Sequence, residues 1–333
     1  MSANSISIAL ATYNGERFVR EQLESFAAQS MLPDELVVCD DGSTDRTVDI
    51  LEQFRDRAPF PVRIHRNKAN LGYVGNFEKA LSLCRGDLIF LSDQDDVWFP
   101  EKLARVAAEF GARPEAMVVL NDQVIADAAL RPTGTTKLGN IRRFGVSPQR
   151  FVTGCCSAHR RSWHDFILPF PPDGGTHDKW INEPAHRLGV AAIIETPLQL
   201  YRRHGENASA NLFSSTRRLG LLDRLAVRLR RFGARTGREG SPALEWEKML
   251  ARTLRGRGDA LAGLGLSNVA ARVGAEIEAR HEIVGRRQFI WTRPRSERLR
   301  LIAGLWGSEA YRSGPAWKNA LIDLVRRRPV DGP

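Results

Sequence analysis

The 333-residue sequence predicts an α/β fold: a Rossmann-like, mostly parallel sheet with flanking helices, followed by a helical, basic C-terminal region. Short apolar runs alternate with helical patterns through about residue 125, and arginine becomes concentrated beyond residue 210. Strands that alternate with helices at this spacing form βαβ units, whose strands run parallel. A composition of 42% hydrophobic and 26% charged residues is typical of a globular protein with an apolar core.

Five apolar runs predict strands, because each is short and bounded by polar or turn residues. They cover residues 5–10, 35–39, 62–65, 87–91 and 116–120. Apolar residues at helical spacing predict helices over residues 16–30, 43–55 and 76–83 and from Pro100 onward. Ser43, Thr44 and Asp45 are expected to cap the second of these helices.

Polar clusters follow three of the predicted strands. Thr12, Tyr13 and Asn14 follow the first, Asp40 and Asp41 the second, and the segment 92–96 the fourth. Ligands of open α/β sheets bind beyond the carboxyl ends of the strands. We therefore expect a binding site at this edge.

The segment Ser92-Asp93-Gln94-Asp95-Asp96 concentrates three carboxylates in four residues. Such carboxylates repel one another unless a cation lies between them, and oxygen ligands suit Mg²⁺ or Mn²⁺. The alternative is a solvated turn in which Asp96 caps the following segment. Asp40 and Asp41 have a similar alternative as a turn and helix cap, although a carboxylate there could also accept the N3–H of a uracil or thymine ring.

Four stretches together resemble family 2 glycosyltransferases of the GT-A fold: Ala-Thr-Tyr-Asn-Gly (11–15), Val-Cys-Asp-Asp-Gly-Ser-Thr-Asp (38–45), Asn-Leu-Gly-Tyr-Val-Gly-Asn-Phe (70–77) and Leu-Ser-Asp-Gln-Asp-Asp-Val-Trp-Phe-Pro (91–100). Thr-Gly-Cys-Cys (153–156), His-Asp-Lys-Trp (177–180) and residues 200–209 resemble the rhamnosyltransferase branch. The resemblance runs in order over residues 5–210 and does not cover the tail.

The resemblance implies roles for individual residues. Asp178 would be the catalytic base, and Asp95, Asp93 and His204 would hold Mg²⁺ or Mn²⁺, with Asp95 the direct ligand. Donor binding would involve Thr12, Tyr13, Asn14, Asp41, Asn70, Gly72, Asn76, Asp93, Gly154, Arg203 and His204. Where the branch has an aromatic residue after the His-Asp pair, this sequence has Lys179, which leaves the acceptor open. His177 is expected to fix its loop through a hydrogen bond, with metal ligation as the alternative.

These roles predict an inverting transferase that moves a sugar, with rhamnose favoured, from a dTDP- or UDP-sugar to an acceptor hydroxyl. The acceptor would be a saccharide or a lipid-linked saccharide, in bacterial cell-surface polysaccharide or glycoconjugate synthesis. One rival is a nucleotidyltransferase, but the glycine-rich loop such enzymes carry after the first strand is replaced here by residues 12–16. The other rival is a non-catalytic nucleotide-sugar-binding protein, although the carboxylates needed for catalysis are present.

Charge divides the chain into a predicted catalytic domain, residues 1–212, and an arginine-rich helical region, residues 213–333. Residues 1–210 carry a net charge of −3 and residues 211–333 a net charge of +13, which gives +10 overall. A helix over residues 217–235 and Arg326–Arg328 would favour an anionic membrane surface. Packing of this helix on the main domain is the alternative, and nucleic acid ranks third. No apolar run is long enough to span a bilayer, no signal peptide is recognised, and the four cysteines show no C-x-x-C spacing. We therefore expect a cytoplasmic protein, peripheral at the inner membrane surface.

Overall fold

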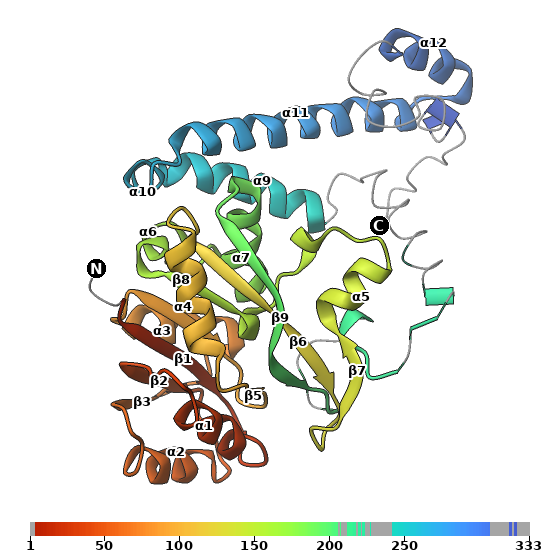
Figure 1. The fold of residues 1–333 in the computed structure, drawn as a ribbon. Helices are drawn as coiled ribbons and strands as arrows, with labels where there is room; N and C mark the ends of the chain where they lie inside the picture. Colours follow the sequence, from red (N-terminus) through yellow and green to blue (C-terminus); the bar gives the residue numbers. More distant parts are fainter. Residues whose placement is uncertain are drawn as a thin grey trace. The chain divides into compact units, whose positions relative to one another are not determined.

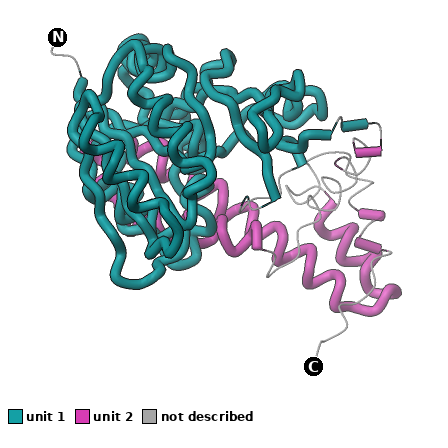
Figure 2. Tube along the Cα trace, turned by 90° about the horizontal axis from the view of Figure 1, so that it is seen from below, with its two compact units in different colours: residues 1–220 teal, residues 221–333 magenta. Residues whose placement is uncertain are grey.

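The computed structural model describes residues 4–205, 207, 212–217, 219–220, 222–223, 227, 242–306, 320–321 and 323–324. The chain divides into two compact units, residues 1–220 and 221–333 (Figure 2). The boundary predicted after residue 212 stays a prediction. Most of the helix expected over residues 217–235, and all of Arg326–Arg328, lie outside the described residues.

Among the described residues of unit 1, nine strands form one sheet in the order β3-β2-β1-β4-β8-β6-β9-β5, with β7 paired to β6 (Figure 1). The strands are β1 (Ile6–Thr12), β2 (Glu35–Asp40), β3 (Val62–Arg66), β4 (Leu88–Ser92), β5 (Val97–Trp98), β6 (Val118–Ala126), β7 (Pro132–Thr136), β8 (Ser157–Arg160) and β9 (Ala191–Arg202). The predicted α/β fold is confirmed, and all five predicted strands are present.

The first four strands in space, β3-β2-β1-β4, are all parallel, as the sequence predicts. The other half of the sheet is mixed: β8 runs antiparallel to both β4 and β6, whereas β6 and β9 are parallel. The predicted strand 116–120 begins at Val118 and continues to Ala126. The carboxyl ends of β1, β2 and β4 therefore lie side by side.

Seven α-helices of unit 1 are described: α1 (Val19–Ala27), α2 (Thr47–Arg55), α3 (Gly72–Leu83), α4 (Lys102–Ala112), α5 (Lys137–Arg143), α6 (His164–Ile167) and α7 (His177–Leu188). Ile8 and Leu10 point to one face of the sheet, because strand side chains alternate. That face packs against α1, α2 and α4 in the main apolar cluster. Helix α3 contacts β1 and β2 without joining this cluster, so it covers the opposite face.

The cap expected at α2 differs from the prediction. The helix begins at Thr47, and Asp45 alone of the predicted trio binds its first turn, accepting the Thr47 N–H at 3.0 Å. The Ser43 hydroxyl instead donates to Asp40. Ser43 thus stabilises the turn after β2 and not the helix.

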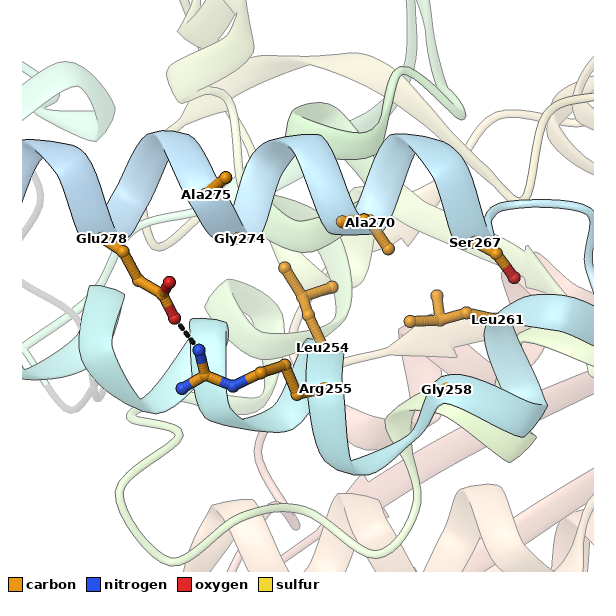
Figure 3. A pocket seen from close by; sticks show the side chains of 10 residues that line it. Leu254, Arg255, Gly258, Leu261, Ser267, Ala270, Gly274, Ala275 and Glu278 are labelled. Atoms are coloured by element: carbon orange, nitrogen blue, oxygen red, sulfur yellow. Dashed lines mark ion pairs between the residues drawn. The ribbon is translucent and has the colours of Figure 1, made fainter.

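Unit 2 is helical in its described part, with α9 (Pro242–Gly256), α10 (Gly258–Gly263), α11 (Ser267–Thr292) and α12 (Arg295–Leu305). A groove of about 340 Å³ lies among α9, α10 and α11, lined mostly by small and apolar side chains, with the Arg255–Glu278 ion pair at one side (Figure 3). No described helix has the length and hydropathy needed to cross a membrane.

Candidate active site

The turn after β2 is organised by a buried aspartate. Asp40 accepts hydrogen bonds from the Thr12 hydroxyl at 3.0 Å and from the N–H groups of Gly42 and Ser43 at 3.2 and 2.9 Å. Its side chain is fully buried. Asp40 therefore links the ends of β1 and β2. The Thr12 hydroxyl donates to Asp40 in this link, and a direct donor contact by Thr12 stays a prediction.

Asp41, the predicted pyrimidine-binding residue, is held in place by one of its carboxylate oxygens. Oδ1 accepts from Asn67 Nδ2 at 2.7 Å and from the Leu71 N–H at 2.8 Å, while Asn70 donates to the Asp41 carbonyl at 3.1 Å. Oδ2 accepts no hydrogen bond from a described residue. The arrangement fixes the carboxylate and leaves one oxygen for a ligand.

Asn76 and Gly72 lie near Asp41 but serve the backbone. The Asn76 amide donates to the Cys39 carbonyl at 2.9 Å and accepts from Asn67 at 2.9 Å, and the side chain is 2% exposed. Gly72 has φ +72°, a left-handed conformation that favours glycine, at the start of α3. Both residues position the Asp41 segment, and a direct donor contact by either stays a prediction.

The segment after β1 is bonded to the turns on both sides of it. The Gln94 amide accepts from the Tyr13 N–H at 2.9 Å and donates to the Tyr13 carbonyl at 3.0 Å. The Asn14 N–H donates to the Ser43 hydroxyl at 2.9 Å. Tyr13 leaves half of its side chain exposed, beside the fixed turn. The three polar clusters therefore form one continuous edge.

The acid loop, residues 92–96, is covered by the chain that follows β9. Asp95 Oδ2 accepts from His204 Nε2 at 2.9 Å and from Asn207 Nδ2 at 3.0 Å. Arg202 donates from Nε to the Asp95 carbonyl at 2.8 Å and pairs with Glu21. The structure thus brings His204 to Asp95, and the arginine that contacts the acid loop is Arg202.

Arg203 lies with its guanidinium 5.8 Å from the centre of the Tyr201 ring. Successive residues at the end of β9 point to opposite sides, which explains why Arg202 faces the acid loop and its neighbour does not. A contact between Arg203 and a diphosphate stays a prediction.

Asp93 stands in a strongly negative environment. Its pKa is raised to about 7, first because surrounding protein removes the carboxylate from water and then because the charges of Asp95 and Asp178 oppose ionisation. Lys137 acts in the opposite direction and lowers this pKa. A divalent cation would relieve the repulsion, so Asp93 and Asp95, with His204 beside them, fit Mg²⁺ or Mn²⁺ in their donor chemistry.

A second group of ligand atoms lies deeper, where Asp93, Asp96 and Cys155 have donor atoms within 4.8 Å of one another. Asp96 is already bonded there, accepting from Gln199 Nε2 at 2.8 Å and from the Arg202 N–H at 3.2 Å. The hydrogen bond with Cys156, burial and the charges of nearby carboxylates raise the pKa of the Cys155 thiol well above its usual value, which disfavours a thiolate ligand. Asp93 and Asp95 therefore suit a hard cation better than this buried group does.

Lys102 lies beneath the acid loop, and its side chain is 1% exposed. Its ammonium donates to the Cys155 carbonyl at 2.8 Å and to the Gln199 amide oxygen, and it lies 3.8 Å from the centre of the Trp98 ring. Burial lowers its pKa to about 8. Lys102 and Gln199 together support Asp96 from below.

Asp178 lies in the first turn of α7, close enough to Asp93 for its charge to raise the pKa of that residue. Its Oδ1 accepts from the Lys179 N–H at 2.8 Å and from the Thr176 hydroxyl. Oδ2 accepts no hydrogen bond from a described residue. One oxygen is therefore fixed and the other can receive a proton.

His177 does not make the hydrogen bond expected of it. Both ring nitrogens are buried with no hydrogen-bond partner among the described residues. The ring stacks on Phe77 at 4.0 Å between centroids and meets the half-exposed Tyr73 edge-on at 6.0 Å. Packing, not hydrogen bonding, holds the His177 ring.

Gly154 is required by the packing of α7. A Cβ at this position would lie 2.6 Å from His177 Nε2 and 3.3 Å from Asp178 Cβ. The glycine lets the chain after Thr153 approach the start of α7, and its predicted contact with the sugar stays a prediction. Lys137, from α5, donates to the Thr153 hydroxyl at 2.5 Å on the same side of the site.

Sequence reasoning missed several residues that shape this site. Arg202 and Asn207 lie within residues 200–209, which resemble the rhamnosyltransferase branch, but roles in that stretch were predicted only for Arg203 and His204. Gln94 stands between two acids and reads as a spacer. Lys102 and Lys137 have no local signal, because a buried lysine in a helix looks like a surface lysine in sequence.

Comparison with known proteins agrees with this architecture. The model of the family "Glycosyl transferase family 2" matches residues 7–168. The dTDP-rhamnosyl transferase RfbG of Shigella flexneri is 38% identical over 234 residues, which cover 64% of this chain and 78% of RfbG. An uncharacterized protein of Mycobacterium tuberculosis, Rv1520, is 29% identical over 223 residues, and the match covers 64% of this chain but only 63% of that protein.

Among solved structures, that of S. aureus TarS residues 1–349 is similar to this one with a TM-score of 0.52 and 18% identity, over 98% of this chain and 81% of that 1–349 chain. The likeness at this identity concerns the fold. On the sequence relationship to RfbG together with the fold, the chain belongs to the family 2 glycosyltransferases.

Proposed function

We propose that this protein is an inverting glycosyltransferase that moves a sugar from a dTDP- or UDP-sugar to an acceptor hydroxyl, with rhamnose as the sugar. One observation carries the proposal: Asp178, more than 80 residues beyond the acid loop, packs beside Gly154, and the next residue, Cys155, places its sulfur within 4.8 Å of a carboxylate oxygen of Asp93. A base and a cation site on one open edge are what a single displacement at an anomeric carbon requires.

The donor end of the site lies at the carboxyl ends of β1 and β2. The unbonded Oδ2 of Asp41 would accept the N3–H of a thymine or uracil ring, and the exposed Tyr13 ring offers a face for the base. RfbG is described as a dTDP-rhamnosyl transferase, and TarS has been crystallised with UDP-GlcNAc. These support a pyrimidine nucleotide donor, and RfbG supports rhamnose.

Asp93, Asp95 and His204 would hold Mg²⁺ or Mn²⁺ at the diphosphate. The ion, when bound, stabilises the negative charge that develops on the leaving diphosphate. His204 already faces Asp95 and packs on Phe18 at 4.4 Å between ring centroids, so its position is set before a ligand arrives. Arg203 would add positive charge from the same segment.

Asp178 would act as the general base. Oδ2 accepts the proton of the acceptor hydroxyl while that oxygen bonds to the anomeric carbon and the bond from this carbon to the diphosphate oxygen breaks. The hydrogen bonds from Thr176 and Lys179 to Oδ1 orient the carboxylate. The half-exposed Tyr73, beside His177, offers an aromatic surface for the acceptor, a saccharide or lipid-linked saccharide. The product would serve a bacterial cell-surface polysaccharide or glycoconjugate.

A non-catalytic nucleotide-sugar-binding protein is the competing function. It would need Asp41 and a cation site but no oriented carboxylate on the acceptor side. The two hydrogen bonds that fix Asp178 favour the enzyme.

Nucleotide-sugar binding with and without metal tests the proposal. We expect dTDP-rhamnose or a UDP-sugar to raise the melting temperature in Mg²⁺ or Mn²⁺, because a bound ligand stabilises the folded state by mass action. Chelator and Asp95→Ala should each abolish the increase, whereas Asp56→Ala, which replaces an exposed acid at the end of α2, should retain it. Stabilisation by none of the nucleotide sugars, or equal stabilisation in chelator, would contradict the proposal, and donor binding without transfer or hydrolysis would favour the binding protein.

A further inference from the structure

In unit 2, the end of α11 and the whole of α12 pack against a short later segment. We call this part the elbow; it comprises residues 286–306, 320–321 and 323–324. At its centre is Asp323, which is fully buried. It accepts two hydrogen bonds of 2.9 Å from Arg287 and one of 2.9 Å from Trp291 Nε1. Arg298, also buried, donates to the Trp291 carbonyl at 2.7 Å and to the Asp323 carbonyl at 3.1 Å. These contacts fix the two helices against the terminal segment.

The inner faces of the elbow are packed, but its outer face remains apolar. Ile290, Trp291 and Ile302 join Ala320 in a buried cluster. Ten large hydrophobic side chains are exposed among the described residues, and four of them belong to the elbow: Phe289, Leu299, Trp306 and Leu321. Their exposed fractions are 50%, 61%, 49% and 52%.

Helical spacing places two of these side chains on one stripe of α12. Leu299, Ala303 and Trp306 recur at i, i+4 and i+7, so they lie on the same side of the helix. The buried residues Arg298 and Ile302 lie on the side that faces the cluster. Ile302 lies three residues after Leu299 and four before Trp306, so the exposed stripe borders the buried side of α12.

The charge around this stripe is positive. Residues 286–306 contain six arginines and one acid, Glu297. Arg287 is neutralised by Asp323, and Arg286 pairs with Glu282. Arg295 and Arg300 are exposed on α12 and form no ion pair with a described residue, and Arg293 lies over the Phe289 ring at 4.3 Å. The outer surface of the elbow thus combines unpaired cations with exposed apolar side chains.

We propose that the elbow docks on an anionic membrane surface, with Leu299 and Trp306 entering the interface and Arg295 and Arg300 facing lipid phosphates. Tryptophan is enriched at membrane interfaces, and arginine near a membrane surface is attracted to anionic lipid. The phosphates of a nucleic acid would pair with the arginines, but the exposed leucine stripe would contact nothing apolar there. The buried Arg287–Asp323 pair holds the surface ready, so docking needs no folding step. The membrane contact predicted for residues 217–235 stays a separate prediction, because most of that segment lies outside the described residues.

Binding of the full chain to vesicles of phosphatidylcholine alone, and of phosphatidylcholine with phosphatidylglycerol, tests this. Each arginine near an anionic surface contributes about 1 kcal/mol, so R295Q/R300Q should bind anionic vesicles on the order of 30-fold more weakly. The matched double variant R252Q/R272Q removes two exposed arginines from α9 and α11 and should bind within a few-fold of the wild type. Leu299→Ser should weaken binding to anionic vesicles while leaving the circular dichroism spectrum unchanged.

Three outcomes would overturn the proposal. The first is equal binding of the wild type to neutral and anionic vesicles, and the second is equal loss in the elbow variant and in its matched control. The third is concentration-dependent self-association, measured by light scattering, that Leu299→Ser abolishes without changing vesicle binding. That result would make the stripe an interface between copies of this chain.

Discussion

Replacing Asp178 by Asn tests the central step of the proposed chemistry. The amide oxygen of Asn can accept the same two hydrogen bonds that Oδ1 accepts from Thr176 and Lys179, so the start of α7 should keep its geometry. The amide nitrogen replaces Oδ2, the oxygen that would receive the acceptor proton. Loss of a general base costs about 10²–10⁴-fold in rate, which corresponds to roughly 3–5 kcal/mol of transition-state stabilisation.

The cost to folding should be much smaller than the cost to catalysis. A carboxylate in the first turn of a helix contributes about 0.3–1 kcal/mol through the helix dipole. Its loss should lower the melting temperature by at most a few degrees in a domain of this size. Removal of the charge also relieves Asp93, whose pKa Asp178 raises, so the acid loop should not be destabilised.

Calorimetric titration with donor and metal, followed by a transfer assay, separates these effects. We expect donor affinity within a few-fold of the wild type and a transfer rate lower by at least about 10²-fold. Asp173→Asn is the matched control, because Asp173 is an exposed acid five residues upstream in the same loop. Near wild-type transfer by the Asp178 variant, with loss in the Asp173 variant, would assign the base to Asp173. Loss of donor binding in the Asp178 variant would make it a donor-holding residue and refute the mechanism.

Two further predictions concern packing and pH. Gly154→Ala should lower the transfer rate by on the order of 10²-fold while nucleotide binding persists, because the new methyl would lie 2.6 Å from His177 Nε2 and displace the base. The control is Gly111→Ala, where a Cβ meets nothing within 4 Å, and it should leave the transfer rate unchanged. An unchanged rate in both variants would contradict the packing argument. Burial lowers the pKa of His164 to about 4 and that of His159 well below 6.5, so the unfolded chain binds more protons below about pH 6.5. The free energy of unfolding should therefore be unaffected above that pH and fall toward pH 4 by up to about 1.4 kcal/mol per pH unit for each histidine. In urea unfolding at several pH values, the free energy of unfolding of His164→Gln should fall less steeply with decreasing pH than that of the wild type. An equally steep fall would refute the attribution of this pH dependence to His164.

Local patterns were enough to predict the parallel half of the sheet. The runs that became β1, β2 and β4 are short, apolar and followed by polar turns, so both their type and the edge at which the site lies could be inferred. The antiparallel half gave weaker signals. Strand β8 is only Ser-Ala-His-Arg, and β5 is two residues long, so neither forms an apolar run. Their pairing depends on contacts with β4, β6 and β9, which no local pattern encodes.

The candidate site divides in the same way. The proximity of His204 to Asp95, 109 residues apart, could be predicted because both lie in motifs of the family. The sequence could not predict that Arg202, and not Arg203, faces the acid loop, because this depends on the side to which each residue at the end of β9 points. His177 illustrates a different limit. A histidine beside an aspartate is expected to hydrogen-bond, but the aromatic rings of Phe77 and Tyr73 come from α3, and the sequence gives no sign that they would surround it.

The three carboxylates of the acid loop lie in two layers, with Asp96 below and Asp93 and Asp95 above. This arrangement explains why they do not compete for one role. Asp96 is fully buried, and its two oxygens are used by Gln199 and the Arg202 backbone, with Lys102 behind Gln199 as a buried cation. In this lower layer, both carboxylate oxygens of Asp96 already accept hydrogen bonds from the protein. Asp93 and Asp95 remain partly exposed above it, and the pKa of Asp93 is raised first by burial and then by the charges of Asp95 and Asp178. The lower layer therefore fixes the backbone of the loop, and the unbalanced upper layer is where a divalent cation would gain most.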